Sequence, residues 1–330
     1  MRHMRKLAIT MGDPGGVGPE VIVRALSAEE VRECCTPIVI GDPEVMREAL
    51  QLVKLPVRLR SIQSPEESDP EAGVIEMISP EEKGAFEKGR PTAAGGRASV
   101  RCIRKAVELS LQRQVGGIVT APISKEALKM AGSKWHGHTE MIAELTGTGD
   151  YAMMLAGGPL KVILATIHTP LRSVPDLITR ETVAKTIGLA QRACEMLGLS
   201  DPRIAVAGLN PHAGEAGIFG DEELREIMPA VGDAKKEGIR VAGPFPPDTV
   251  FHAAYKGEFD IVVCMYHDQG LIPLKMIAFE KGVNVTVGLP IIRTSPDHGT
   301  AYDIAWKGVA DPSSMCEAIT LAARLRLPVR

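Results

Sequence analysis

The sequence predicts an α/β protein with largely parallel sheets, and three observations support this fold class. Short apolar runs that are typical of buried strands alternate with amphipathic runs along nearly the whole chain. Prolines stand at the first turn of several amphipathic runs, where helices tolerate them best. The chain has 330 residues, of which 45% are hydrophobic and 24% charged, as in an ordinary globular protein. Strands that alternate with helices in this way form parallel sheets.

The individual elements follow from the same patterns. Strands are predicted at residues 6–12, 36–42, 57–62, 74–79, 116–124, 151–157, 160–168, 203–210, 259–268 and 283–290. Helices are predicted at residues 19–27, 43–53, 92–114, 125–132, 136–147, 179–198, 221–238, 300–308 and 313–325. In an open parallel sheet the ligand site lies outside the carboxyl ends of the strands. Chemically active side chains are therefore expected just after predicted strands.

Composition and charge exclude several classes of partner. The net charge of -3 is too small and too mixed to indicate binding to nucleic acid. No apolar run reaches the roughly 18–20 residues that a membrane span requires. The amino terminus passes from a few basic residues directly into a strand, so we expect no signal peptide. The six cysteines form no CxxC pair and are interpreted as buried free thiols of a cytoplasmic protein.

Three predicted strands are each followed by a histidine. His168 follows VILATI, His212 follows RIAVAGLNP, and His267 follows IVVCMY, each close to a proline or a glycine. A single histidine of this kind is more often a packed or hydrogen-bonded residue than a ligand. Three at equivalent positions are better explained by one shared metal ion, because neutral imidazole is a common metal ligand. No local zinc motif such as HExxH is present, so the spacing alone leaves this open.

Glycine-rich stretches give a weaker signal. MGDPGGVGPE, at residues 11–20, lies between a strand and a helix and could bind phosphate through backbone amides or form a tight crossover turn. The only near match to the dinucleotide fingerprint is GTGDYA, at residues 147–152. It follows a helix and precedes a strand, the reverse of the order that the Rossmann motif requires. A Rossmann site is therefore not predicted.

Polar residues within apolar segments indicate an anionic ligand. Lys275, Asn284 and Arg293 are spaced through the mostly apolar carboxyl-terminal third. Buried Lys and Arg near a site are readily explained by phosphate or carboxylate, although each could be a surface residue that covers apolar area. His138 and Thr139 begin a predicted helix and could present an imidazole, a hydroxyl and free amides to an anion. The local pattern alone favours ordinary helix capping for these two residues.

Taken together, these motifs resemble the 4-hydroxythreonine-4-phosphate dehydrogenase family, PdxA. The strings that carry the resemblance appear in family order over nearly the whole chain: MGDPGGVGPE, TAPISKEAL, GHTE, ATIHTPL, GLNPHAGE, PPDTVF, MYHDQGLIPLK, GVNVT and GLPIIRTSPDHGTAYDIA. The resemblance includes the phospho-D-threonate and phospho-D-erythronate dehydrogenase paralogues. It implies a two-domain fold like that of isocitrate and isopropylmalate dehydrogenases, without a Rossmann motif. The expected domains are residues 1–130 with 270–330, and residues 131–269, with the active site in the cleft between them.

The resemblance also implies roles for particular residues. The family's metal ligands fall on His168, His212 and His267, the last supplied by the other subunit of a homodimer. Its substrate contacts fall on His138, Thr139, Lys275, Asn284 and Arg293. Asp248, in PPDTVF, is a candidate acid–base carboxylate. No residue could be assigned to the coenzyme.

The family reaction is oxidation of a phosphorylated hydroxy acid by NAD or NADP, with one divalent metal ion per site, for which zinc, magnesium and cobalt are the candidates. The resemblance implies that 4-phosphohydroxy-L-threonine becomes a 3-keto acid and loses carbon dioxide to give 3-amino-2-oxopropyl phosphate, in pyridoxal 5'-phosphate biosynthesis. The alternative substrates are 4-phospho-D-threonate or 4-phospho-D-erythronate in sugar-acid catabolism, or the cis-dihydrodiols of aromatic acids. The alternatives from other classes are a metal-dependent phosphohydrolase that uses the His267–Asp268 pair, a phosphate acetyltransferase, and a non-catalytic phosphoacid-binding protein.

Overall fold

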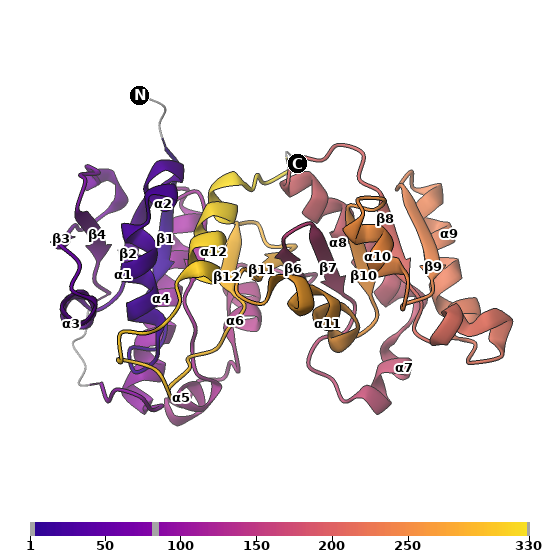
Figure 1. Ribbon diagram of the computed structural model, residues 1–330, viewed down its shortest axis with the longest axis horizontal. Helices are drawn as coiled ribbons and strands as arrows, with labels where there is room; N and C mark the ends of the chain where they lie inside the picture. Colours follow the sequence, from indigo (N-terminus) through magenta and orange to yellow (C-terminus); the bar gives the residue numbers. More distant parts are fainter. Residues whose placement is uncertain (1–3, 81–85, 329–330) are drawn as a thin grey trace. The chain divides into compact units, whose positions relative to one another are not determined.

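The structure is a computed structural model that describes residues 4–80 and 86–328. The chain folds into two compact units, shown in Figure 1. The amino-terminal unit contains the described residues up to Gly149 together with Leu289–Arg324, and the middle unit contains Asp150–Gly288 with residues 325–328. Within the described residues, no helix combines the length and apolar character needed to cross a membrane.

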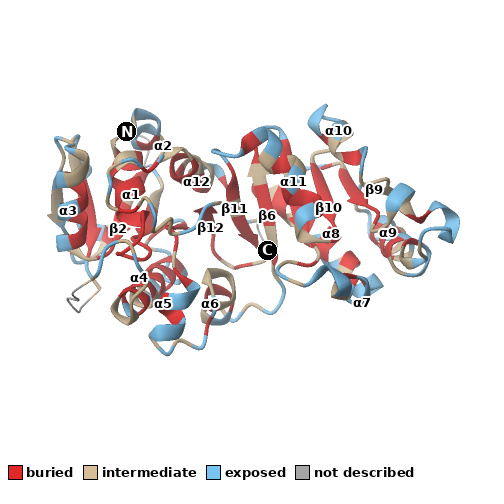
Figure 2. Ribbon diagram, turned by 60° about the horizontal axis from the view of Figure 1, so that its bottom comes forward, coloured by how far each residue is buried: buried red, intermediate tan, exposed pale blue. Residues whose placement is uncertain are grey.

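Six parallel strands form the sheet of the amino-terminal unit, in the order β3-β4-β2-β1-β5-β12. The strands are β1 (Lys6–Thr10), β2 (Thr36–Ile40), β3 (Arg58–Ser61), β4 (Val74–Ile78), β5 (Ile118–Thr120) and β12 (Arg293–Pro296). The helices are α1 (Gly18–Ser27), α2 (Glu29–Cys34), α3 (Pro43–Val53), α4 (Ala93–Leu111), α5 (Lys125–Met130), α6 (His138–Leu145) and α12 (Ser313–Arg324), with a short 3₁₀ turn at Pro65–Glu67. Helix α1 packs with α3 and α12, and α4 packs with α5 and α6, so two groups of helices cover the sheet (Figure 2).

The middle unit has a mixed sheet in the order β11-β6-β7-β10-β8-β9. Its strands are β6 (Ala152–Gly157), β7 (Leu160–Leu164), β8 (Ile204–Ala207), β9 (Val241–Phe245), β10 (Ile261–Cys264) and β11 (Val283–Val287). Strands β7, β10, β8 and β9 run parallel, whereas β6 is antiparallel to both β7 and β11. The helices are α7 (Val174–Leu177), α8 (Arg180–Met196), α9 (Met228–Lys236), α10 (Val250–Tyr255) and α11 (His267–Ala278). Short helical turns lie at Leu171–Ser173, Pro211–Gly217 and Glu223–Ile227.

Local sequence explains where the main helices begin. The side chains of Asp42, Thr92, Ser124 and Thr179 each accept a hydrogen bond from a backbone N–H in the first turn of α3, α4, α5 and α8. Such caps satisfy amides that have no partner within the helix. The central strands of both sheets are mostly buried, as the red ribbons in Figure 2 show, whereas β3 and β9 at the edges are only partly buried. The predicted α/β class with largely parallel sheets is confirmed.

The two units divide the chain at positions other than those expected from the sequence. Residues 131–149 belong to the amino-terminal unit, because α6 packs against α4. Residues 270–288 belong to the middle unit, because α11 packs on β7 and β11 pairs with β6. In the expected domains and in the observed units alike, the first unit is built from two separate segments, because the chain returns to it near its end.

The predicted helix at 300–308 was wrong, since this segment consists of turns. Ala301 and Trp306 have positive φ angles of 41° and 62°, which an α-helix does not allow. Its polar side chains bond instead to the turn after β1: Tyr302 Oη donates to Asp13 Oδ2 at 2.9 Å, and Trp306 Nε1 donates to the carbonyl of Pro14 at 3.0 Å. Long-range hydrogen bonds have overridden a helical pattern here.

Candidate functional site

The three predicted metal ligands follow three strands that are neighbours in the middle sheet. His168 follows β7, His267 follows β10 and His212 follows β8, and these strands are adjacent and parallel in the order β7-β10-β8. The carboxyl ends of parallel neighbours lie at one edge of a sheet, so the topology directs all three loops to the same edge. The common position that the sequence suggested is thus present in the fold.

Two of these histidines lie close together within one chain. The ring centroids of His168 and His267 are 5.5 Å apart. His267 Nδ1 is 2.7 Å from Asp268 Oδ1, and this pairing leaves Nε2 of the imidazole for another partner. Histidine ligands of metals usually donate their second ring N–H to a carboxylate, a backbone carbonyl or a water, which fixes the ring and its tautomer. The chemistry of this donor pair fits a divalent metal ion.

His212 does not complete the set within a single chain. No group of three metal-ligating side chains forms among the described residues. His212 is exposed, with its ring centroid 6.1 Å from that of Phe219, and lies in a turn of unusual conformation. Four non-glycine residues, His212, Ala213, Glu215 and Ala216, have φ angles between 41° and 55°. Left-handed conformation costs roughly 1–2 kcal/mol for each such residue, so the turn stores about 4–8 kcal/mol that other contacts must offset.

A buried cation lies in the amino-terminal unit. Arg293, at the start of β12, is 2% exposed, and its Nε and Nη2 donate to Thr120 Oγ1 at 3.2 and 2.8 Å. Thr120 ends β5 and is fully buried. Burial lowers the pKa of the Arg293 guanidinium. A buried guanidinium is most readily stabilised by an anion, so Arg293 has the properties expected of a phosphate or carboxylate contact.

His138 lies near this arginine and has an unsatisfied ring nitrogen. It is the first residue of α6, and its buried Nε2 atom has no hydrogen-bond partner among the described residues. Burial, together with the charge of Arg293, holds the pKa of His138 well below its ordinary value, against a hydrogen bond with the Ala121 backbone. The imidazole is therefore neutral near pH 7 and its Nε2 is available to a ligand. Thr139 follows it in the first turn of α6 and is half-buried.

The remaining predicted contacts belong to the middle unit. Asn284, in β11, has a buried Oδ1 without a hydrogen-bond partner among the described residues, so this oxygen can accept a hydrogen bond from a ligand. Lys275, in α11, is half-buried, with its Nζ 5.7 Å from the centre of the Phe279 ring. Asp248 is exposed in the turn after β9. Because β9 is parallel to β8, Asp248 comes after the carboxyl end of its strand on the same side of the sheet as His212.

The glycine-rich segment at 11–20 is a tight crossover turn. The Gly15 N–H donates to Asp13 Oδ1 at 2.8 Å, the Gly16 N–H to the carbonyl of Asp13 at 3.0 Å, and the Val17 N–H to the carbonyl of Thr300 at 3.0 Å. A Cβ atom on Gly18 would lie 2.4 Å from the Met11 carbonyl oxygen, so the chain is closely packed there. Because these N–H groups bond within the chain, the structure favours the tight crossover turn over the phosphate site that the sequence also left open.

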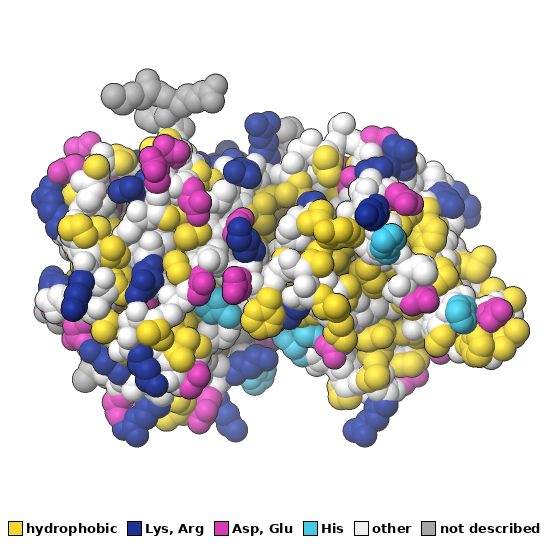
Figure 3. Space-filling model, viewed as in Figure 1, with side chains coloured by type: hydrophobic (Ala, Val, Ile, Leu, Met, Phe, Trp, Pro, Cys, Tyr) yellow, Lys and Arg dark blue, Asp and Glu magenta, His cyan; other side chains and the backbone are white. Residues whose placement is uncertain are grey.

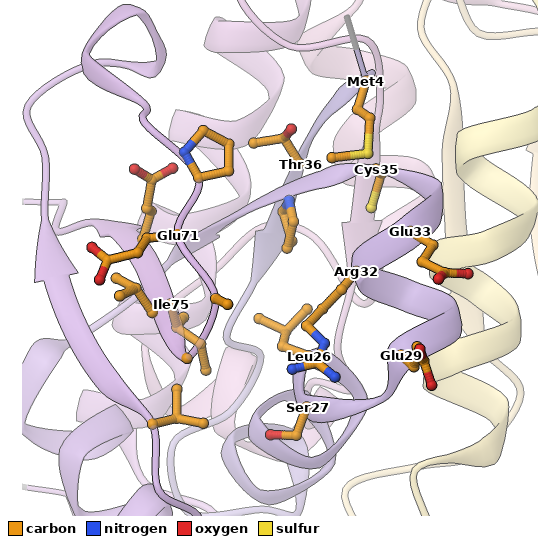
Figure 4. Close-up of a pocket in the computed structure, with 17 residues that line it drawn as sticks. Met4, Leu26, Ser27, Glu29, Arg32, Glu33, Cys35, Thr36, Glu71 and Ile75 are labelled. Carbon is orange, nitrogen blue, oxygen red and sulfur yellow. The ribbon is translucent and has the colours of Figure 1, made fainter. Parts of the chain in front are cut away.

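A cavity of about 450 Å³ opens at the amino ends of the strands of the amino-terminal sheet (Figure 4). It is lined by Thr36 and Val74, the first residues of the parallel strands β2 and β4. Figure 4 shows Glu71 and Ile75 facing Leu26 and Arg32 across it. None of the predicted site residues lines this cavity. Because ligand sites of parallel sheets lie at the carboxyl ends of the strands, we do not assign it to the reaction.

Two residues beside the predicted ligands were not found by sequence reasoning. Thr120 stands within the apolar run GGIVTAP, and its role depends on Arg293, which is 173 residues away in the chain. The sequence suggested Asp268 only as half of a possible phosphohydrolase pair. In the structure its Oδ1 lies 2.7 Å from His267 Nδ1, at the start of α11. The adjacency of histidine and aspartate in MYHDQG was the one signal that could have identified the second of these.

Comparison with known proteins identifies the family of this chain. The family described as "Pyridoxal phosphate biosynthetic protein PdxA" matches residues 33–322. A protein of Desulfosudis oleivorans named 4-hydroxythreonine-4-phosphate dehydrogenase is 51% identical over 96% of this chain and 94% of its own. One of Pectobacterium atrosepticum named D-threonate 4-phosphate dehydrogenase is 48% identical over 97% of this chain and 98% of its own. The crystal structure of 4-hydroxythreonine-4-phosphate dehydrogenase from Klebsiella pneumoniae is 45% identical, covers 97% of this chain and 98% of its own, and superposes with a TM-score of 0.91. By sequence and by fold, this chain belongs to the PdxA family, whose relatives are dehydrogenases.

Proposed function

We propose that this protein oxidises 4-phosphohydroxy-L-threonine with NAD or NADP to the 3-keto acid, which then loses carbon dioxide to give 3-amino-2-oxopropyl phosphate. The observation that carries the proposal is the agreement between family membership and the chemistry of the side chains. A buried arginine and two unsatisfied buried polar atoms, on His138 and Asn284, suit an anionic, hydrogen-bonding substrate. The product would enter pyridoxal 5'-phosphate synthesis.

The charges of the substrate match the available cations. A phosphorylated hydroxy acid carries a phosphate and a carboxylate, and Arg293 and Lys275 are the basic residues proposed to hold them. Arg293 is fixed by Thr120 before any ligand arrives, so less side-chain entropy is lost on binding. His138 remains neutral and has its backbone partner at Ala121, so its Nε2 can accept a hydrogen bond from a substrate hydroxyl. The Thr139 hydroxyl can donate to an anion without altering the charge of the site. Such contacts fix the orientation of the reacting carbon.

His168, His212 and His267 are proposed to hold one divalent ion, with zinc, magnesium and cobalt as candidates. When bound, such an ion lowers the pKa of a coordinated hydroxyl and stabilises negative charge on oxygen. Asp268 keeps the His267 ring in one orientation through the 2.7 Å contact at Nδ1. Asp248 is the candidate for moving the hydroxyl proton, since it is exposed at the edge of the sheet that the histidine loops share.

We further propose that the protein acts as a homodimer and that His267 reaches the partner's metal site. Helix α11 supports a dimer because its outer face carries Ile272, Met276 and Phe279, which are 59%, 83% and 76% exposed. Figure 3 shows this largely apolar face over α11. Exposed apolar surface of this kind usually marks a protein interface. The same helix begins with His267 and carries Lys275, so an interface formed by α11 would bring functional residues near the partner.

The ring centroids of His168 and His267 lie 5.5 Å apart within one chain, so the two histidines could serve one site of their own chain or two sites of the dimer. An experiment with mixed subunits distinguishes these arrangements. Inactive His168→Ala and His267→Ala proteins would be mixed and allowed to exchange subunits. If each site takes His267 from the partner, hybrid dimers contain one complete set of histidines and part of the activity returns. If both histidines serve the site of their own chain, every site in the hybrid lacks one ligand and no activity returns despite proven exchange.

The substrate is tested by offering 4-phosphohydroxy-L-threonine and 4-phospho-D-threonate side by side and following reduced nicotinamide. We expect the first to be oxidised with the higher kcat/KM. The second is a real competitor because relatives named for D-threonate 4-phosphate are 48% identical, almost as similar as those named for 4-hydroxythreonine-4-phosphate. Preference for the threonate would keep the chemistry and assign the protein to sugar-acid catabolism. Turnover of neither compound, with metal and either coenzyme present, would contradict the proposal.

A further inference from the structure

The turn that carries His212 requires support from outside its own residues. The residues from His212 to Gly217 all have positive φ angles, and four of these six residues are not glycine. Left-handed backbone is unfavourable for residues with a Cβ atom and persists only when surrounding contacts hold it. Pro211 precedes the turn, but most residues of the segment are exposed, so burial of its own side chains does not provide the support.

The support comes from the carboxylate of Glu223. Its Oε1 accepts hydrogen bonds from the backbone N–H groups of Leu209 and Asn210, both at 2.7 Å, and its Oε2 accepts one from Asn210 Nδ2 at 3.0 Å. Glu223 is 2% exposed and begins a π-helical turn, Glu223–Ile227, a conformation that is rare and often found at functional sites. A buried carboxylate with three donors is a strong anchor, because hydrogen bonds to ionised acceptors are short and strong.

Glycines leave room for this carboxylate. A Cβ atom on Gly214 would lie 2.6 Å from Glu223 Oε2, and one on Gly208 would lie 3.1 Å from Glu223 Oε1. The carboxylate is therefore in contact with both the beginning and the middle of the loop that carries His212. The neighbouring Glu222 also accepts from Asn210 Nδ2, at 2.7 Å, but accepts no backbone N–H within residues 4–80 and 86–328, so it offers a matched control.

We propose that Glu223 is the positioning residue for His212: its carboxylate holds residues 208–214 and so keeps the left-handed turn, and the imidazole on it, in one conformation. Glu223 acts through the backbone and touches neither metal nor substrate. The inference deepens the proposed function, because it concerns the residue that function assigns as a metal ligand. It makes a separate physical claim, that the turn loses its order when the carboxylate is changed.

The test compares Glu223→Gln with Glu222→Gln in the metal-free full-length protein. Glutamine keeps the size of the side chain and can still accept the two backbone N–H groups. Its amide nitrogen, however, faces the Asn210 donor and cannot accept from it. We expect amide hydrogen exchange in residues 209–217 to become at least about tenfold faster in Glu223→Gln, while exchange in β10 and α8 stays unchanged. Glu222→Gln should exchange like the wild type.

Two further measurements separate positioning from general damage. Co²⁺ titration should show affinity about 10–100-fold weaker for Glu223→Gln, as for other changes to residues that orient a ligand. Adding Ala216→Gly, which removes the Cβ atom from a position with φ of 55°, should restore part of the affinity and of the protection from exchange. Unchanged exchange in Glu223→Gln, or no rescue by Ala216→Gly, would overturn the inference.

Co²⁺ binding by the His212→Ala variant tests the proposed metal site independently of Glu223. If that variant binds Co²⁺ as tightly as the wild type, His212 is not a ligand and the proposed metal site is wrong. Faster exchange in Glu223→Gln would still establish what holds the turn. If His212→Ala binds weakly while Glu223→Gln matches the wild type in both measurements, the metal assignment stands and the positioning role is refuted.

Discussion

Replacing Thr120 with valine should destabilise the amino-terminal unit by more than its change in size suggests. Thr120 Oγ1 accepts two hydrogen bonds from Arg293, at 3.2 and 2.8 Å, and both residues are at most 2% exposed. Valine has almost the same shape as threonine, so packing is preserved. The change leaves two N–H groups of a buried guanidinium without this acceptor.

The size of the effect follows from the chemistry of the pair. A hydrogen bond to a charged group contributes about 1.5–3 kcal/mol, and an unsatisfied buried donor costs a similar amount. Because the two bonds share one acceptor, we expect Thr120→Val to lower the free energy of unfolding by about 2–4 kcal/mol. Thr120→Ser keeps the hydroxyl and removes one methyl group, which should cost only about 0.8–1.5 kcal/mol.

The assay is urea unfolding of both variants and the wild type, compared by transition midpoint at constant slope. Thr120→Val should also raise KM for the phosphorylated substrate more than it lowers kcat, because a misplaced Arg293 affects binding of the anion in both ground and transition state. If the valine variant is within about 0.5 kcal/mol of the serine variant, the hydroxyl does not hold the arginine and the reasoning fails.

Three further predictions concern packing, thiol chemistry and pH. Gly18→Ala should lose about 1–3 kcal/mol of stability, because its Cβ would lie 2.4 Å from the Met11 carbonyl oxygen. Gly188→Ala, in α8, should gain about 0.5–1 kcal/mol, because an added Cβ would meet no atom within 4 Å outside its own stretch of helix. Equal melting temperatures of the two variants would contradict this. The hydrogen bond from the Cys35 thiol lowers the pKa of Cys34 to about 7; burial opposes this shift, and Thr320 and Arg324 assist it. Alkylation of the protein should therefore show a fast phase with a midpoint near pH 7, and Cys34→Ser should remove that phase. A midpoint near the ordinary thiol value would refute this. The low pKa of His138 means that the unfolded chain binds a proton there as pH falls below about 6.5 while the folded chain does not, so the wild type should lose stability relative to His138→Gln below that pH. Parallel stability curves for the two proteins would show that His138 titrates normally.

Local patterns predicted most strands and helices because each is a short, self-contained signal. The run PEVMREALQLV begins with proline after the capping residue Asp42, and helix α3 covers the same residues, Pro43–Val53. Helix α11 was missed because Gly270 and Pro273 interrupt its pattern. Strand β9, Val241–Phe245, was missed because it contains a glycine and a proline and is only partly buried. In both cases the sheet and its neighbours impose a conformation that the local residues do not favour.

The site could be predicted only where side chains follow strands. His168, His212 and His267 were singled out by that position, and the structure has the three strands as neighbours in the middle sheet. Their role as metal ligands was implied by the family resemblance and stays a prediction. The six cysteines were expected to be buried, yet Cys34 is half-exposed at the end of α2, which the sequence did not indicate. Thr120 and Glu223 act through residues 173 and 13–14 positions away, so no local pattern could identify them.

The most direct test of the central claim is reduced-nicotinamide formation from 4-phosphohydroxy-L-threonine by protein dialysed free of metal, with and without added divalent ion, for the wild type and for His212→Ala. We predict no turnover by the dialysed wild type, recovery when zinc, magnesium or cobalt is added, and no recovery for His212→Ala despite an unchanged fold. Turnover by the metal-free protein, or full-rate turnover by His212→Ala, would contradict the account of a dehydrogenase whose three strand-end histidines hold one metal ion.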